Sequence, residues 1–157
     1  MFEIGDKVFY PMHGAGVIEA IEKREILGET HKYCLFTIFG SNMDVMIPLK
    51  NMEKTGIRQV VNKETVREIL HEFHTEESTC KLAWKARFKQ NTDKLKTGKM
   101  EDAAEVVRDL LHREMESALN ASEKQMLNNA RKMLISELSI IKNISEDQAA
   151  EMLILSH

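Results

Sequence analysis

Residues 2–19, FEIGDKVFYPMHGAGVIE, contain the pattern that decides the fold of the first part of the chain. Lys7 to Tyr10 and the run that begins at Gly16 are rich in β-branched and aromatic residues, which favours strands. Pro11 and Gly14 interrupt these runs, as is typical of a tight corner in a curled sheet. This stretch therefore predicts two strands joined by a sharp corner.

The strand pattern continues to about residue 50. Further strands are predicted at Gly16 to Ile26, Lys32 to Phe39 and Met43 to Pro48. The turns Leu27-Gly28-Glu29 and Gly40-Ser41-Asn42 are short enough for hairpins, so we expect an antiparallel meander. About 50 residues with this pattern predict a small, strongly bent antiparallel β-barrel.

From Asn62 onward the apolar residues recur with the helical period. Asn62 is expected to cap a first helix, and the polar segment His74 to Thr79 is expected to be a loop. Four more helices are predicted: Lys81 to Thr97, Met100 to Ser117, one with a capping box of Ser122 and Gln125, and one with a capping box of Ser145 and Gln148 that ends near Leu155. The sequence therefore predicts an α+β protein, with a β domain at residues 1–60 and an all-α domain at residues 61–157.

The composition fits a folded protein without a membrane segment. Hydrophobic residues make up 43% of the 157 residues, which is enough apolar side chain for a core. No apolar run reaches the roughly 18 residues of a membrane span, and the N-terminus lacks the features of a signal peptide. Cys34 and Cys80 are too few for a disulfide framework. We therefore expect a cytoplasmic protein with free thiols and no membrane partner.

Basic residues are concentrated in one segment, although the net charge is only -3. Residues 79–99 hold seven basic side chains and one acidic side chain, Asp93, and they include the only tryptophan, Trp84. At the helical period, Trp84, Phe88, Asn91 and Leu95 share one stripe. Both borders of this stripe are basic, with Lys81, Lys85 and Lys89 on one side and Arg87 and Lys94 on the other.

This stripe has two interpretations. In the first, Trp84 and Phe88 belong to an ordinary core and the lysines are solvated. In the second, the stripe is a surface that follows phosphates, with an aromatic side chain placed to stack on bases or wedge between them. Trp84 lies in the first turn of the predicted helix, beside the polar loop, and this position favours the second interpretation.

Motifs for catalysis or metal binding are weak. His71, His74 and Cys80 form at most an incomplete metal site, because no second pair of ligands follows. Gly98-Lys99-Met100 lacks the remaining residues of a phosphate-binding loop, and no nucleophile with a base is recognisable. We expect no catalytic activity, cofactor, metal or small-molecule substrate.

Segments in both halves of the chain resemble the CarD/CdnL family of bacterial transcription regulators. Phe2 to Glu19 is similar to the opening of that family. Ala104 to Leu110 (AEVVRDL) and Ser122 to Leu127 (SEKQML) are similar to signatures of its helical domain, and Trp84 to Lys89 (WKARFK) resembles its basic segment with a tryptophan. The resemblance covers essentially the whole chain.

The resemblance implies a Tudor-like barrel that docks on the β-subunit lobe of RNA polymerase, and a helical domain that contacts promoter DNA at the upstream edge of the transcription bubble. Trp84 would be the wedge in the minor groove. Arg87 and Lys89 would contact the nearby backbone, with Lys85 as a further candidate. On the polymerase side, Arg24 matches a basic contact position, whereas Met46 stands where we expect a polar or basic residue in some relatives.

The expected function is therefore a transcription regulator that stabilises the open promoter complex. An apolar wedge compensates for unstacking only where the DNA is already distorted, as at a bubble edge. A weak DNA contact also needs a tether, which the polymerase supplies. One alternative is a protein-interaction adaptor on RNA polymerase, whose basic helix binds an acidic partner and makes no direct contact with DNA. The other is a small enzyme that uses His71, His74 or Cys80.

Overall fold

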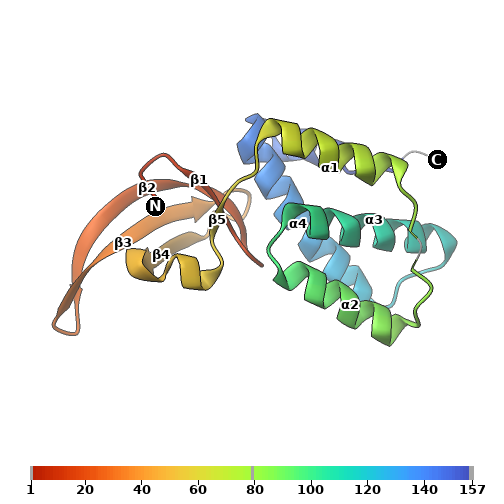
Figure 1. Cartoon of the computed structure of the whole chain (residues 1–157), viewed down its shortest axis with the longest axis horizontal. Helices are drawn as coiled ribbons and strands as arrows, with labels where there is room; N and C mark the ends of the chain where they lie inside the picture. The colour runs from red at the N-terminus through yellow and green to blue at the C-terminus, as the bar shows by residue number, and fades with distance from the viewer. Residues whose placement is uncertain (1, 79, 156–157) are drawn as a thin grey trace.

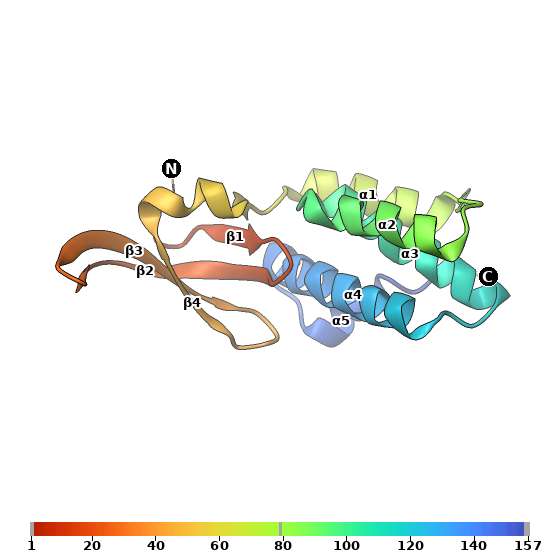
Figure 2. The same ribbon diagram turned by 90° about the horizontal axis from the view of Figure 1, so that it is seen from below.

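The computed structural model describes residues 2–78 and 80–155, and it contains a β-sheet followed by a group of helices. Figure 1 shows the two parts side by side along the long axis, and Figure 2 shows the same order from below. The predicted α+β class, with an antiparallel sheet first and helices after it, is confirmed. Thr79, at the end of the predicted polar loop, lies outside the described residues.

Five strands form one curved sheet in the order β4-β3-β2-β1-β5 (Figure 1). β5 (Arg58–Gln59), a strand that was not predicted, pairs with β1. A bulge between Ile18 and Ala20 adds local twist and bending to β2. The other four strands form the predicted antiparallel meander: β1 (Lys7–Tyr10), β2 (Gly14–Ile26), β3 (Glu29–Ile38) and β4 (Asp44–Pro48).

One face of the sheet carries its own small core. Alternate strand residues point to this face, and Phe36 and Ile38 of β3 are almost fully buried there. Two short 3-10 helices follow β4, namely η1 (Leu49–Asn51) and η2 (Glu53–Thr55). Met52, between these two helices, completes the cluster without any exposed surface.

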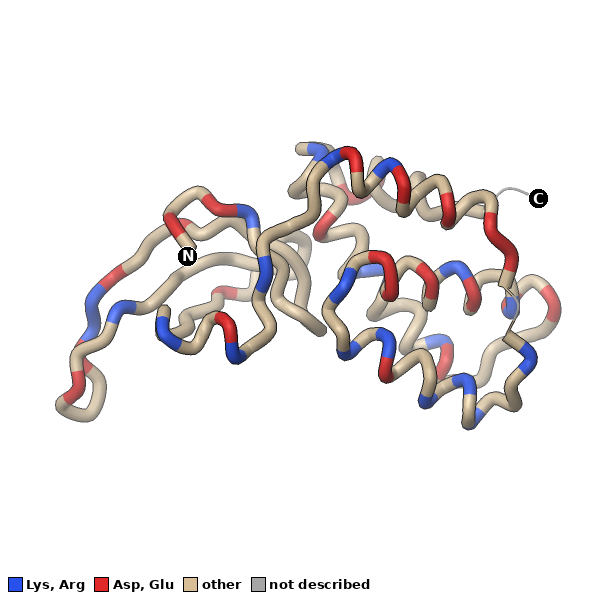
Figure 3. The backbone as a smooth tube through the Cα atoms, viewed as in Figure 1, with Lys and Arg blue, Asp and Glu red and all other residues tan. Residues whose placement is uncertain are grey.

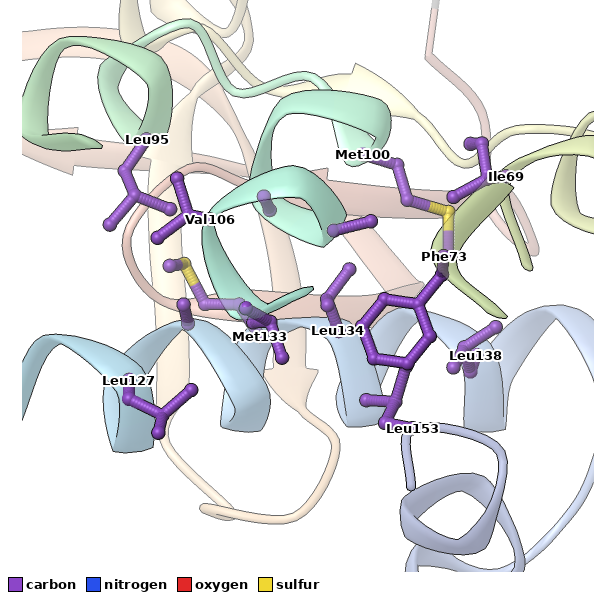
Figure 4. Close-up of a cluster of buried hydrophobic side chains, with 14 of the residues drawn as sticks. Ile69, Phe73, Leu95, Met100, Val106, Leu127, Met133, Leu134, Leu138 and Leu153 are labelled. Atoms are coloured by element: carbon purple, nitrogen blue, oxygen red, sulfur yellow. The ribbon is translucent and has the colours of Figure 1, made fainter. Parts of the chain in front are cut away.

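Five helices form the second part: α1 (Lys63–Thr75), α2 (Trp84–Lys96), α3 (Met100–Glu116), α4 (Ala121–Lys142) and α5 (Glu146–Glu151). Figure 4 shows apolar side chains that these helices direct toward one another, among them Phe73, Val106 and Leu134. This cluster also includes Phe9 and Ala15 of the sheet, so the larger core extends across the junction. Of the described helices, none combines the length and apolarity that a membrane span requires.

Two of the predicted helix starts are confirmed by their caps. The side chain of Asn62 accepts a hydrogen bond from the backbone N–H of Thr65 at 2.7 Å, which starts α1. Ser145 and Gln148 form the predicted capping box of α5, with each side chain accepting from the backbone of the other residue. These signals were readable because each cap lies within three residues of the group that it satisfies.

Two other predicted starts are wrong. The capping box of Ser122 and Gln125 does not form, because the side chain of Asn120 caps α4 by accepting from the N–H of Glu123. α2 begins at Trp84 rather than near Lys81, after an extended N-cap residue at Ala83. Trp84 is therefore the first residue of its helix, and the segment before it is extended.

The corner between β1 and β2 packs directly on α4. The hydroxyl of Ser136 accepts from the N–H of Ala15 at 2.8 Å and lies 3.0 Å from the carbonyl of Phe39, to which it can donate. Gly14 has a φ of 137°, and a Cβ there would lie 3.0 Å from both Ser136 Oγ and Ile38 Cγ2. This glycine serves the turn, as predicted, and it also allows the close approach to α4.

A partly buried ion pair joins the sheet to the same helix. Glu137 of α4 is 1% exposed, and its two carboxylate oxygens accept from Arg58 of β5 at 2.7 and 2.9 Å. The remaining Nε–H of Arg58 donates to the carbonyl of Gly98 at 2.8 Å. The guanidinium carbon also lies 4.6 Å from the ring centre of Phe9. One side chain of the two-residue strand β5 thus links β1, the α2–α3 connection and α4.

Arg58→Met should destabilise the whole chain by about 3 kcal/mol, because it leaves the Glu137 carboxylate buried without its cation. Urea unfolding followed by circular dichroism measures this change. Arg24→Met is the control, since it removes an exposed arginine of the same sheet and should change the stability by less than about 0.5 kcal/mol. Equal unfolding midpoints for the two variants would contradict a structural role for the Arg58–Glu137 pair.

Candidate nucleic-acid interface

Trp84 stands at the free end of α2. Its surface is 45% exposed, and its ring lies edge-on to that of Phe88 with the ring centres 6.4 Å apart. No described side chain caps the start of α2, so the first N–H groups of the helix are available to an anion. The prediction that Trp84 lies where packing is thin is confirmed, and the interpretation as ordinary core is wrong for Trp84, although Phe88 packs against the helical core.

One border of the predicted basic stripe faces solvent. Lys81, Lys85 and Lys89 are all exposed, and Figure 3 shows basic positions along α2 beside the acidic positions of α3. Lys89 forms an exposed ion pair with Asp93, one helical turn later, at 3.2 Å. An exposed pair of this kind is weak, so Lys89 remains able to exchange Asp93 for a phosphate.

The other predicted border differs from the first, because both of its cations are paired within the fold. Arg87 is 6% exposed, and its guanidinium donates to the two carboxylate oxygens of Glu123 at 2.7 and 2.8 Å. Lys94 lies 3.7 Å from Glu105 of α3. Arg87 was predicted to contact the DNA backbone, but the residue that it binds is 36 positions further along the chain, which a helical wheel does not reveal.

The pair between Arg87 and Glu123 fixes the position of Trp84. The hydrogen bond to Glu123 raises the pKa of Arg87 above its ordinary value, so the guanidinium stays charged. Its third contact is the carbonyl of Leu82, at 3.0 Å, in the extended segment just before α2. Arg87 thereby ties the first turn of α2 and the segment before it to α4, while Trp84 stays outside.

Burial increases along the predicted stripe from one end to the other. Trp84 is exposed, Phe88 is partly buried, and Asn91 and Leu95 are buried. The N-terminal end of the stripe is therefore its most exposed part. Sequence reasoning missed Glu123, although a signal exists: Glu123 lies three positions before Met126 and seven before Ala130, on the apolar stripe of α4.

Arg24 and Met46, the residues predicted for the polymerase side, lie on one face of the sheet. Arg24 of β2 is opposite His31 of β3, and Met46 of β4 is opposite Leu35 of the same strand β3. His31 and Leu35 are four residues apart, so their side chains share a face. Both candidates are exposed, and Arg24 forms an ion pair with Glu22 at 2.9 Å.

His71, His74 and Cys80, which the sequence does not favour as a metal site, have separate surroundings in the structure. Nε2 of His74 lies 2.8 Å from the carbonyl of Met152, and the sulfur of Cys80 lies 3.9 Å from Gln90 Oε1. His71 is exposed on α1. Within residues 2–78 and 80–155, no three His, Cys, Asp or Glu side chains are arranged to hold a metal ion.

Comparisons with known proteins match both parts of the chain. Residues 2–61 match the family described as the CarD-like/TRCF RID domain, and residues 65–154 match the CarD C-terminal domain. YdeB of Bacillus subtilis (strain 168), named as a proposed transcription factor, is 52% identical over 148 residues, which cover 94% of this chain and 97% of YdeB. The solution structure of the N-terminal domain of Myxococcus xanthus CarD is 25% identical, with a TM-score of 0.33, and covers 38% of this chain and 79% of that domain.

Glu123→Gln should loosen the start of α2, because it removes the negative charge that balances the buried guanidinium of Arg87. We expect a loss of about 3 kcal/mol in stability and faster hydrogen exchange in residues 84–88 than in the rest of the helices. Hydrogen exchange measured by mass spectrometry tests both the loss of stability and the faster exchange in residues 84–88. Asp93→Asn is the control, since it removes the exposed partner of Lys89 and should leave exchange unchanged; faster exchange there but not in the Glu123 variant would contradict the anchoring role.

Proposed function

The chain belongs to the CarD/CdnL family of transcription regulators, and we propose that it binds RNA polymerase and stabilises the open promoter complex. In this proposal, residues 1–60 form the domain that docks on the β-subunit lobe. Residues 61–157 form the domain that contacts promoter DNA in the minor groove at the upstream edge of the bubble. The regulator acts in the cytoplasm without a catalytic step, cofactor or metal.

The observation that carries the proposal is the exposed Trp84 on a rigid support. An indole inserted between base steps must offset a few kcal/mol of unstacking, so it acts where the bases are already separated. A wedge also has to resist being pushed back into its own core. The buried pair of Arg87 and Glu123 holds the first turn of α2, which carries Trp84, on α4 and supplies that resistance.

Phosphate contacts come from the neighbours of Trp84. Lys85 and Lys89 are exposed on the same helix, and the uncapped N–H groups at its start favour an anion. Arg87 is a positioning residue in this proposal, since its donors are already engaged by Glu123 and Leu82. Two or three phosphate contacts give weak, salt-sensitive binding, which suits a protein that reaches DNA only when attached to polymerase.

In this proposal, the sheet attaches the chain to RNA polymerase. The face that carries Arg24 and Met46 joins a cation to exposed apolar surface, a combination suited to a protein partner. β4 lies at the edge of the sheet, so its outer backbone groups are available for pairing with a strand of the partner. Attachment there raises the effective concentration of promoter DNA near Trp84, so a weak contact can extend the lifetime of the bubble.

Trp84→Ala should remove most of the gain in open-complex lifetime, because stacking of one aromatic side chain on a base contributes about 1–3 kcal/mol. The measurement is the decay of competitor-challenged complexes, for which we expect the lifetime gain to fall about tenfold. Trp84→Phe should keep part of the gain. Leu27→Ala, which removes an exposed apolar side chain at the β2–β3 turn, is the control and should keep all of it. If Trp84→Ala binds polymerase and keeps the full gain, the wedge is refuted and the adaptor without DNA contact takes its place.

Arg24→Glu should weaken binding to a fragment of the polymerase β-subunit lobe by about tenfold, since it reverses one charge at the contact. Fluorescence anisotropy with labelled fragment measures the affinity. Lys23→Glu is the matched control, because Lys23 is the adjacent residue of β2 and points to the other face of the sheet. Equal affinities for the Arg24 variant and the parent chain would refute this contact.

A further inference from the structure

A groove next to the stripe of α2 described above lies where the β1–β2 corner meets α2 and α4. Its volume is about 400 Å³. α2 contributes Phe88, Thr92, Leu95 and Lys96, α4 contributes Ser122, Gln125, Met126 and Asn129, and the corner contributes Met12. Phe88, Leu95 and Met126 belong to or pack against the helical core, so the floor of the groove is apolar and fixed.

Met12, which lines this groove, has a backbone conformation that residues with a side chain rarely adopt. It follows Pro11 in a turn that is closed by a hydrogen bond from the His13 N–H to the Tyr10 carbonyl at 3.0 Å. Its φ of 72° is in the left-handed region, where glycine or asparagine is the favoured residue in such a turn. Met12 is also 55% exposed and belongs to neither buried cluster, so packing within the chain does not explain it.

The charges around the groove have one sign. Lys96 lines it, and Lys85 and Lys89 continue the same border of α2 toward the N-terminus. The opposite wall is polar and uncharged, with Ser122, Gln125 and Asn129 exposed along one stripe of α4. The described lining contains no carboxylate. Asp93 forms an ion pair with Lys89 and does not line the groove.

We propose that this groove binds an acidic amphipathic helix of a partner protein, whose apolar side chains contact Met12, Phe88 and Met126 while its carboxylates face the lysines of α2. The part of α2 between Phe88 and Lys96 is about 12 Å long, which matches two turns of a bound helix with anchors at i, i+3 or i+4, and i+7. Methionine suits such a surface because its flexible, polarisable side chain adapts to the shape of the partner.

The surface of duplex DNA matches the chemistry of this groove less well than it matches the exposed surface around Trp84. A duplex presents phosphates at its edge and keeps its bases stacked inside, so it has no exposed apolar ridge for a concave apolar floor. The proposal therefore goes beyond the DNA and polymerase contacts, and it adds a protein contact beside the border of α2 that carries Lys85 and Lys89.

The test uses a fluorescein-labelled helical peptide of about 16 residues, with leucines at i, i+3, i+4 and i+7 and glutamates on both flanks. Anisotropy with the full chain, without polymerase or DNA, measures its affinity. Met12→Gly should weaken binding about tenfold, since it removes a large apolar contact, while keeping the thermal midpoint within a few degrees of the parent.

Gln125→Glu should weaken binding severalfold by placing a carboxylate on the wall, and a peptide with lysines in place of the glutamates should bind severalfold more weakly than the acidic peptide.

Leu27→Gly is the matched control. Leu27 is a second exposed apolar residue with a positive φ, 53°, in a turn of the same sheet, and it does not line the groove. Its replacement should leave peptide affinity unchanged. The proposal is overturned if Met12→Gly binds the peptide as the parent does. It is also overturned if Met12→Gly instead weakens binding of a forked DNA duplex, or self-association in sedimentation, while the acidic peptide shows no binding. The open-complex assay with Trp84→Ala is independent of all these outcomes.

Discussion

Two buried glutamates on one side of α4 determine how the other elements of this protein are held. Glu123 and Glu137 are fourteen positions apart, which corresponds to about 21 Å along the helix. Each accepts two hydrogen bonds from an arginine of a distant segment, Arg87 of α2 and Arg58 of β5. A buried carboxylate without its cation is costly, so each pair strongly favours one arrangement of its partner segment over the alternatives. α4 thus orients both the start of α2 and the edge of the sheet.

This arrangement explains how a large aromatic side chain stays outside the core. The apolar stripe of α2 ends in Leu95, which is buried, and the same stripe would carry Trp84 inward if the helix packed uniformly along its length. Arg87 occupies the space between the first turn of α2 and α4, and its bonds are satisfied there. The exposed indole thus belongs to a first helical turn that this polar contact holds on α4.

The same helix connects the two candidate interaction surfaces. The sheet is attached to α4 through Ser136 and Glu137, and α2 is attached through Glu123. A tether increases local concentration only if its geometry allows both sites to be engaged at once. Direct hydrogen bonds from the corner at Ala15 and from Arg58 restrict the motion between sheet and helices, so docking of the sheet would also direct Trp84. The groove beside Met12 lies at this junction, where a partner would contact both parts.

The sequence by itself determined the class of the fold, four of the five strands and the five α-helices, but not the two 3-10 helices η1 and η2. The β-branched and aromatic residues of Lys7–Tyr10 and the helical period after Asn62 are local signals, and the caps at Asn62 and Ser145 satisfy groups within three residues. The short strand β5 gave no periodic signal, because two residues are too few to define one. Trp84 and its exposed lysines were identified from the same local pattern. Only the tertiary structure decided that Arg87 is an internal support, that Arg24 and Met46 share a face, and that Met12 lines a groove. These properties depend on pairing between segments distant in sequence, and the free energy of a buried charge is set by the partner that the fold brings to it.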